Sequence, residues 1–192
     1  MSFALLAGIV SLLAYLPLVK AWQKGDFVPH RATWIIWSIT SGLTALAMNQ
    51  GGAGLNILTP IGFLIGSGFI ATLAFKRGVG GWETLDKVCI TISAIGIIFW
   101  LKSGSPTQGL LFQILADAAG GIPTIIKAWK EPDSESPFGW MIFLVGGVLM
   151  FLAAKDYSFI EIGYSCFLVV FQGIMVAFLF RGNYPLNLLK KK

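Results

Sequence analysis

The chain has 192 residues, of which 56% are hydrophobic and 12% charged, and its mean hydropathy is +0.77. A water-soluble domain of this size needs more polar surface than this composition supplies, so a soluble fold is excluded. The formal net charge of +5 does not indicate a nucleic-acid-binding surface, because the basic residues stand in the connections between apolar blocks and form no patch.

The apolar residues are gathered in blocks of roughly 17 to 23 residues that contain almost no charge, which is the length a helix needs to cross a hydrocarbon core of ~30 Å. A helix also satisfies its own backbone hydrogen bonds in lipid. The first block lacks the basic start and the small-residue cleavage site of a signal peptide, so we expect it to be a span. The predicted spans are 3–19, 32–49, 57–75, 86–102, 108–127, 138–154 and 158–180.

The second span carries the first candidates for a binding site. Trp37 is followed by four hydroxyl residues within two turns, and a flat ring beside hydroxyls suits a polar solute. Trp34, and Trp140 in the sixth span, lie close to the predicted membrane edge, so we expect them in the interfacial belt of aromatic residues. The other polar residues expected to line the path are Asn56, Ser67, Gln113 and Gln172. Such residues could equally hold helices together by hydrogen bonds.

Asp117 is the one carboxylate well inside an apolar block, in the fifth span. An ionised carboxylate in lipid costs several kcal/mol, so we expect this side chain to face a polar cavity or to bind a proton. The alternative is a structural acid that hydrogen-bonds a neighbouring helix.

Two prolines lie near the ends of matching spans. Pro17 and Pro123 each remove a helical hydrogen bond, which makes them hinge candidates, although each could simply end its helix. Pro29 and Pro137 are expected in the first turns of the second and sixth spans, with Ser136 as a cap.

No cluster of ligands indicates a metal or a cofactor. His30 stands alone in a loop, and Asp117 has no second ligand near it in the sequence. Cys89 and Cys166 both fall inside apolar blocks, where small core residues are expected rather than a disulfide.

The positions of Lys and Arg predict the orientation of the chain. Twelve of the fourteen basic residues lie in alternate connections and the C-terminal tail, on one side of the predicted spans, and only Lys102 and Lys155 lie on the other. The side with twelve is expected to be cytoplasmic. The N-terminus is then outside and the C-terminus inside, most simply in a plasma (inner) membrane. An odd number of spans is required for this, in agreement with seven.

The two halves of the chain repeat one another. Lys20-Ala21-Trp22 recurs as Lys127-Ala128-Trp129, 107 residues later. Two further segments recur in the same order, 32–37 as 138–143 at a spacing of 106 and 74–78 as 178–182 at a spacing of 104. Each unit contains three spans, so a single extra span between them leaves both units in the same orientation. We therefore predict two parallel triple-helix bundles, in residues 1–81 and 107–192, joined by a linker span in 82–106.

This three-one-three arrangement resembles the SWEET sugar transporters and the PQ-loop family. The local motif is Pro123 near the cytoplasmic end of a span, a basic stretch, a short Ser/Glu turn and the next span at Trp140. The resemblance implies an alternating-access transporter, and in some PQ-loop proteins an acid in the equivalent helix couples transport to protons. The glutamine that follows proline in that family is Leu18 in one copy and Thr124 in the other. The asparagines of SWEET sugar sites are matched only by Asn56 and Gln172.

The function expected from these observations is transport of a small polar solute, sugar-like or amino-acid-like, between spans 1–3 and 5–7. Asp117 would bind the solute or carry a proton. The alternative is a non-transporting receptor or scaffold of the same fold. An enzyme is not expected, because no base or nucleophile accompanies the single acid. The expected partners are the solute and the lipid bilayer, and a homo-oligomer is left open.

Overall fold

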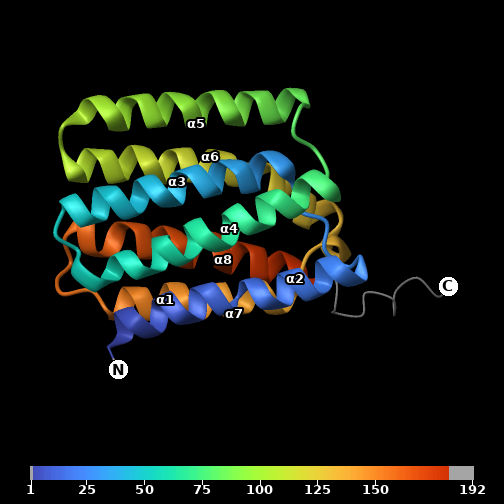
Figure 1. Cartoon of the computed structure of the whole chain (residues 1–192), viewed down its shortest axis with the longest axis horizontal. Coiled ribbons are helices and arrows are strands. Elements are labelled where there is room, and N and C mark those ends of the chain that lie inside the picture. The colour runs from blue at the N-terminus through green and yellow to red at the C-terminus, as the bar shows by residue number, and fades with distance from the viewer. Residues whose placement is uncertain (1, 182–192) are drawn as a thin grey trace.

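The computed structural model describes residues 2–181, and within this range the chain is helical (Figure 1). The α-helices are α1 (Phe3–Leu13), α2 (Tyr15–Lys24), α3 (Arg31–Gln50), α4 (Leu58–Lys76), α5 (Thr84–Ser103), α6 (Pro106–Lys130), α7 (Pro137–Leu152) and α8 (Phe159–Arg181). Two short 3-10 helices, η1 (Gly54–Ile57) and η2 (Pro132–Ser134), lie in the connections. The helix limits agree with the predicted spans to within a few residues, except that the first extends to Lys24 and is broken at Ala14.

Five helical segments are long and apolar enough to cross a membrane, which is compatible with an integral membrane protein. They are Phe3–Lys24, Gly54–Lys76, Thr84–Lys102, Pro106–Lys130 and Phe159–Arg181. α7 is apolar but shorter, and α3 is long but rich in hydroxyl residues. Large apolar side chains are exposed along the outer faces of the helices, for example Phe75, Leu101 and Val170 at 69%, 66% and 62%. Water-soluble proteins do not expose apolar surface on this scale.

The helices run alternately in opposite directions, so the connections gather at two ends of the molecule (Figure 1). The end that holds the α2–α3, α4–α5 and α6–α7 connections also holds the described Lys and Arg residues other than Lys102 and Lys155. We call it the basic end, and the other the opposite end.

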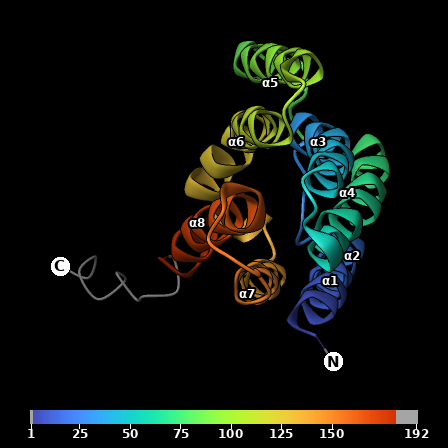
Figure 2. The same cartoon turned by 90° about the vertical axis from the view of Figure 1, so that its left-hand side faces the viewer.

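With α1 and α2 taken as one broken helix, the helices other than α5 pack as two groups of three (Figure 2). α4 lies between α1 and α3 in the N-terminal bundle, and α8 lies between α7 and α6 in the C-terminal bundle. The bundles meet through two contacts, α3 with α6 and α1 with α7. In the repeat, α1 corresponds to α6 and α3 corresponds to α7. The α1–α7 contact is therefore the equivalent of the α3–α6 contact. α5 lies outside both groups and packs mainly on α6.

The same pair of side chains closes each bundle at the basic end. The guanidinium of Arg77 lies 4.1 Å from the ring centre of Trp22 and donates to its backbone oxygen over 2.9 Å. In the C-terminal bundle, Arg181 lies 3.4 Å from the ring centre of Trp129 and donates to its backbone oxygen over 2.7 Å. Cation–π contact and hydrogen bond together join the first helix of each bundle to the third. The tryptophan of each repeated Lys-Ala-Trp segment therefore has an arginine partner in space, Arg77 in the first copy and Arg181 in the second.

The two hinge candidates differ in their helices. α1 ends at Leu13, four residues before Pro17, and α2 begins after Ala14. In a continuous helix the ring of Pro17 would clash with the carbonyl of Leu13. Pro123 lies inside α6, which continues unbroken to Lys130. Neither proline ends its helix. Pro137 occupies the first turn of α7 with Ser136 as its cap, as predicted, whereas Pro29 precedes α3 by two residues and lies outside it.

His30 is not alone, because it joins the N-terminal bundle to the start of α5. Its Nε2 lies 3.3 Å from Oδ1 of Asp86, whose Oδ2 accepts from the backbone N–H of Gly81 over 2.6 Å. Burial is the main cause that lowers the pKa of His30 below its usual value, so at neutral pH the contact is a hydrogen bond from a neutral ring. The prediction that both cysteines lie in the core is correct for Cys89, which is buried, and wrong for Cys166, which is on the outer face of α8.

Candidate functional site

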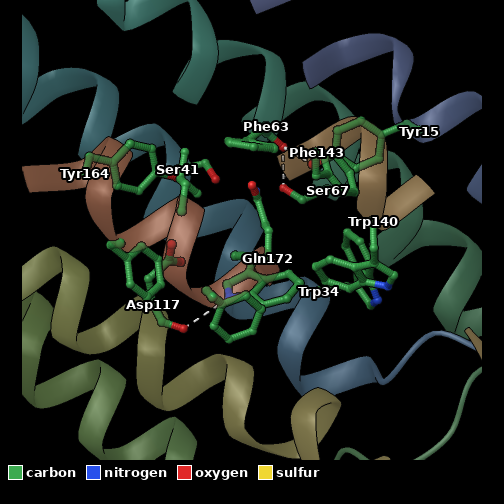
Figure 3. A pocket seen from close by; sticks show the side chains of 14 residues that line it. Tyr15, Trp34, Ser41, Phe63, Ser67, Asp117, Trp140, Phe143, Tyr164 and Gln172 are labelled. Atoms are coloured by element: carbon green, nitrogen blue, oxygen red, sulfur yellow. Dashed lines mark hydrogen bonds between the residues drawn. The ribbon is translucent and has the colours of Figure 1, made fainter. Parts of the chain in front are cut away.

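A cavity of about 40 Å³ lies between the two bundles (Figure 3). A water molecule needs roughly 10–15 Å³, so the cavity in this form has room for a few waters and not for a solute. The cavity is lined by Tyr15, Trp34, Trp37, Ser41, Phe63, Ser67, Asp117, Trp140, Phe143, Tyr164, Phe167, Leu168, Phe171 and Gln172. These residues come from α2, α3 and α4 on one side and from α6, α7 and α8 on the other.

The carboxyl group of Asp117 is buried and contacts α3. Oδ1 forms a hydrogen bond with the hydroxyl of Thr40, and the backbone oxygen of Asp117 accepts from Nε1 of Trp37 over 3.1 Å. The Thr40 hydroxyl is also 3.0 Å from the backbone oxygen of Ile36. A hydroxyl has one hydrogen, so it either donates to an ionised Asp117 or donates to Ile36 while accepting from a protonated Asp117. The arrangement accommodates both protonation states.

Trp37 stands at the centre of an aromatic wall. Its ring centre lies 5.2 Å from that of Trp34, 6.0 Å from that of Trp140 and 5.4 Å from that of Phe171, each in an edge-to-face arrangement. The expectation that Trp34 and Trp140 belong to an interfacial belt is wrong, because they are 1% and 2% exposed and line the cavity. Both lie toward the helix ends in sequence, but their side chains point between the bundles.

Polar groups of the wall fall into two classes. The Ser67 hydroxyl donates to the backbone oxygen of Phe63 over 2.5 Å, and Tyr164 and Ser41 are hydrogen-bonding neighbours, so these groups are satisfied within the protein. Nε1 of Trp34 and Oε1 of Gln172 are buried without a hydrogen-bond partner. Buried polar groups are normally paired, so an unpaired donor and an unpaired acceptor on residues that line a cavity indicate a place for water or a ligand.

Four of the six predicted lining residues lie together in the cavity wall: Trp37, Ser67, Asp117 and Gln172. Asn56 and Gln113 are not among the lining residues. Gln113 is buried one turn before Asp117 on α6, with both amide atoms unpaired. Asn56 lies in η1 at the opposite end, where it binds an acid instead.

A buried polar cluster joins the bundles at the basic end, and we call it the Lys127 cluster. Nζ of Lys127 lies 2.7 Å from Oε1 of Glu135 and donates to the backbone oxygens of Val28, over 2.6 Å, and Ser134, over 3.2 Å. Oε2 of Glu135 accepts from Nε1 of Trp140 over 2.9 Å. Val28 belongs to the N-terminal bundle and the other members to the C-terminal bundle. The hydrogen bond from Lys127 to Val28 therefore joins one bundle to the other, and the ion pair with Glu135 holds the lysine in place.

A second cluster joins the bundles at the opposite end, and we call it the Glu161 cluster. Oε2 of the buried Glu161 accepts from Nδ2 of Asn56 over 3.0 Å and from the backbone N–H of Lys155 over 3.3 Å. Nζ of Lys155 donates to the backbone oxygen of Gly52 over 3.2 Å. Asn56 and Gly52 belong to the N-terminal bundle, Lys155 and Glu161 to the C-terminal one. The cavity thus lies between two closures.

Sequence reasoning missed most of the aromatic wall. Tyr15, Phe63, Phe143, Tyr164 and Phe171 resemble any other residue of an apolar block, and the only signal was that Tyr15 stands in the repeated segment around Pro17. Residues 2–181 contain no group of three or more His, Cys, Asp or Glu side chains that could hold a metal ion. Comparisons with protein-family models, curated proteins and solved structures gave no match for this chain.

Proposed function

We propose that the chain is a seven-span membrane transporter that moves a small polar solute by alternating access. The observation that carries this proposal is the cavity, which holds a buried carboxylate between two bundles that a polar cluster joins toward each end. A protein that served only as a scaffold has no need of an interior carboxylate between two separable closures.

The seven-span topology adds α3 and α7 to the five helices that are apolar enough by themselves. The hydroxyls of Thr33, Thr40, Ser41 and Thr44 lower the hydropathy of α3, but all four side chains are buried and need not face lipid. α7, with 16 residues, is about 24 Å long, and a bilayer thins or neighbouring helices adjust around a short span. In this topology the basic end is cytoplasmic and the N-terminus is outside.

The arrangement of parallel repeats is supported by three observations. The helices of each bundle pack in the same series, the bundles meet through two equivalent contacts, and the Trp22–Arg77 and Trp129–Arg181 pairs recur at matching positions. The resemblance to the SWEET and PQ-loop families adds to these. We therefore retain the division into residues 1–81, 82–106 and 107–192.

Transport in this scheme requires the closures to open in turn. Opening the Lys127 cluster exposes the cavity to the cytoplasm, and opening the Glu161 cluster exposes it to the outside. Pro123 lies six residues beyond Asp117 on α6, and the break at Ala14 lies next to Tyr15 of the cavity wall. Pro123, and Pro17 just beyond the break, each lack the N–H of one helical hydrogen bond, so bending near them moves the cavity wall relative to the basic end.

Asp117 is expected to bind the solute or carry a proton, since both of its protonation states have a hydrogen-bonding partner in Thr40. The test is uptake of sugars, amino acids and nucleosides into proteoliposomes, with and without a pH gradient. Asp117→Asn should abolish uptake. Asp156→Asn, which changes an exposed loop acid and preserves its bond to Ser158, should not. Gradient-independent uptake that survives Asp117→Asn would remove Asp117 from the mechanism. No uptake of any solute, together with a stable cytoplasmic binding partner, would favour a receptor or scaffold.

A further inference from the structure

The cavity wall is strongly aromatic and carries one carboxylate. Nine of its fourteen residues have aromatic rings, Asp117 is the one acid among them, and no Lys, Arg or His is present. The face of an aromatic ring is electron-rich and attracts cations, most strongly where water is excluded. Rings around a single buried carboxylate form an environment of negative potential.

The protein supplies no positive charge to the cavity wall, because the buried lysine of this region is already paired. Lys127 is held by Glu135 and by two backbone oxygens, so its charge is compensated outside the cavity. An anionic solute would therefore meet Asp117 without a counter-charge. A neutral solute would leave the rings and the carboxylate without a charged partner.

Two unpaired atoms of the wall add a polar requirement. Nε1 of Trp34, on a residue 1% exposed, is a donor that needs an acceptor, and Oε1 of Gln172, on a residue 3% exposed, is an acceptor that needs a donor. A solute with a hydroxyl or carbonyl oxygen beside its charged group offers an acceptor for Trp34.

We infer that the transported solute is a small organic cation, an amine or quaternary ammonium with a neighbouring oxygen, whose charge is held between Asp117 and the ring of Trp37. This inference rests on the proposed function and specifies the solute of the same site. Because the wall holds a single carboxylate, the cation and a proton occupy it in turn. The cavity in this form is too small for such a solute, so binding takes place in a form in which one closure is open.

The test compares solutes that differ in charge alone. Choline and its uncharged isostere 3,3-dimethylbutan-1-ol have nearly the same size and the same hydroxyl, and the three tryptophans of the wall report binding through their fluorescence in lipid nanodiscs. Choline, tetramethylammonium or ethanolamine should quench this fluorescence at concentrations about tenfold or more below those of the neutral isostere. Choline should also be taken up by proteoliposomes.

Variants then assign the binding to the site. Asp117→Asn should weaken choline binding by about a hundredfold, because a buried charge pair loses one partner, whereas the loop control Asp156→Asn should leave it unchanged. Trp37→Phe keeps a ring face and should retain more affinity than Trp37→Leu, which keeps the apolar volume without the ring. These two substitutions keep the comparison decisive if Asp117→Asn fails to fold.

Equal binding of choline and its neutral isostere would overturn the cation assignment. Uptake of glucose or another neutral solute, with no response to any of the three cations, would also overturn it while leaving the proposed transport intact. Failure of every cation and every neutral solute in both binding and uptake would overturn the transport proposal together with this one.

Discussion

The two contacts between the bundles are equivalent in the repeat but differ in chemistry. The α3–α6 contact contains Asp117, Thr40 and Trp37, linked by hydrogen bonds. At the matching place in the α1–α7 contact, Ser11 is fully buried and packs against Gly146, where an added Cβ would lie 2.5 Å from the Ser11 hydroxyl oxygen. One contact is polar and faces the cavity, and the other is close-packed through small residues.

This difference suggests how a symmetric scaffold performs an asymmetric task. Small residues let α1 and α7 approach closely, which suits a contact that stays together while the bundles tilt. In the proposed mechanism, the α3–α6 contact holds the groups that change partner when a solute or proton binds. The same division appears at Lys20 and Lys127, which match in the repeat. Lys20 is exposed, whereas Lys127 is buried in its cluster.

The largest effect is expected from breaking the Lys127 cluster. Lys127→Met leaves the buried Glu135 carboxylate without its partner and should destabilise the folded protein by about 3–5 kcal/mol. Lys20→Met, at the matching exposed position, should change stability by less than about 0.5 kcal/mol. Thermal unfolding of the purified protein in detergent measures both.

A double variant separates the effect of losing the Lys127–Glu135 ion pair from the effect of losing the Lys127 side chain. Lys127→Met with Glu135→Gln removes both charges and should recover a substantial part of the stability lost in Lys127→Met alone. If Lys20→Met were as destabilising as Lys127→Met, the distinction between the two repeats at this position would be lost.

The sequence predicted the helices well because span length and charge sidedness depend on local composition. It also predicted that Asp117 faces an interior cavity or hydrogen-bonds a neighbouring helix, and the carboxyl group does both, in a wall that is more aromatic than predicted. The positions of Trp34 and Trp140 could not be predicted in this way. Depth along a helix does not say whether a ring points to lipid or to the other bundle. Asn56 was misleading for a related reason, because its partner Glu161 lies 105 residues away in the sequence.

A medium effect is expected from adding a methyl group to the α1–α7 contact. Gly146→Ala places a Cβ against Ser11 and should destabilise the protein by about 1–3 kcal/mol through overpacking. Gly173, on α8, has nothing within 4 Å of an added Cβ, so Gly173→Ala should instead stabilise by about 0.5–1 kcal/mol. Unfolding midpoints of the two variants should move in opposite directions, and a shared direction would mean that the α1–α7 contact has room to adjust.

The smallest effect is expected at a contact that the two repeats share. Arg77→Lys and Arg181→Lys keep the positive charge but lose the planar group that stacks on the tryptophan ring and donates to its backbone oxygen. Each should destabilise its bundle by about 0.5–1 kcal/mol. Similar shifts in the unfolding temperature are expected for both, and a large difference would show that the two pairs have diverged in importance.

α5 contributes none of the residues that line the cavity and leaves most of its surface uncovered. In the proposed topology its role is to reverse the direction of the chain, so that a duplicated three-helix unit enters the membrane the same way round as the first. Its sequence is then constrained by the need to insert into the membrane more than by packing against neighbouring helices. Two separate polypeptides, each carrying one bundle, would contain every side chain of the site. An ancestor that assembled from two identical three-helix chains would have had no use for α5.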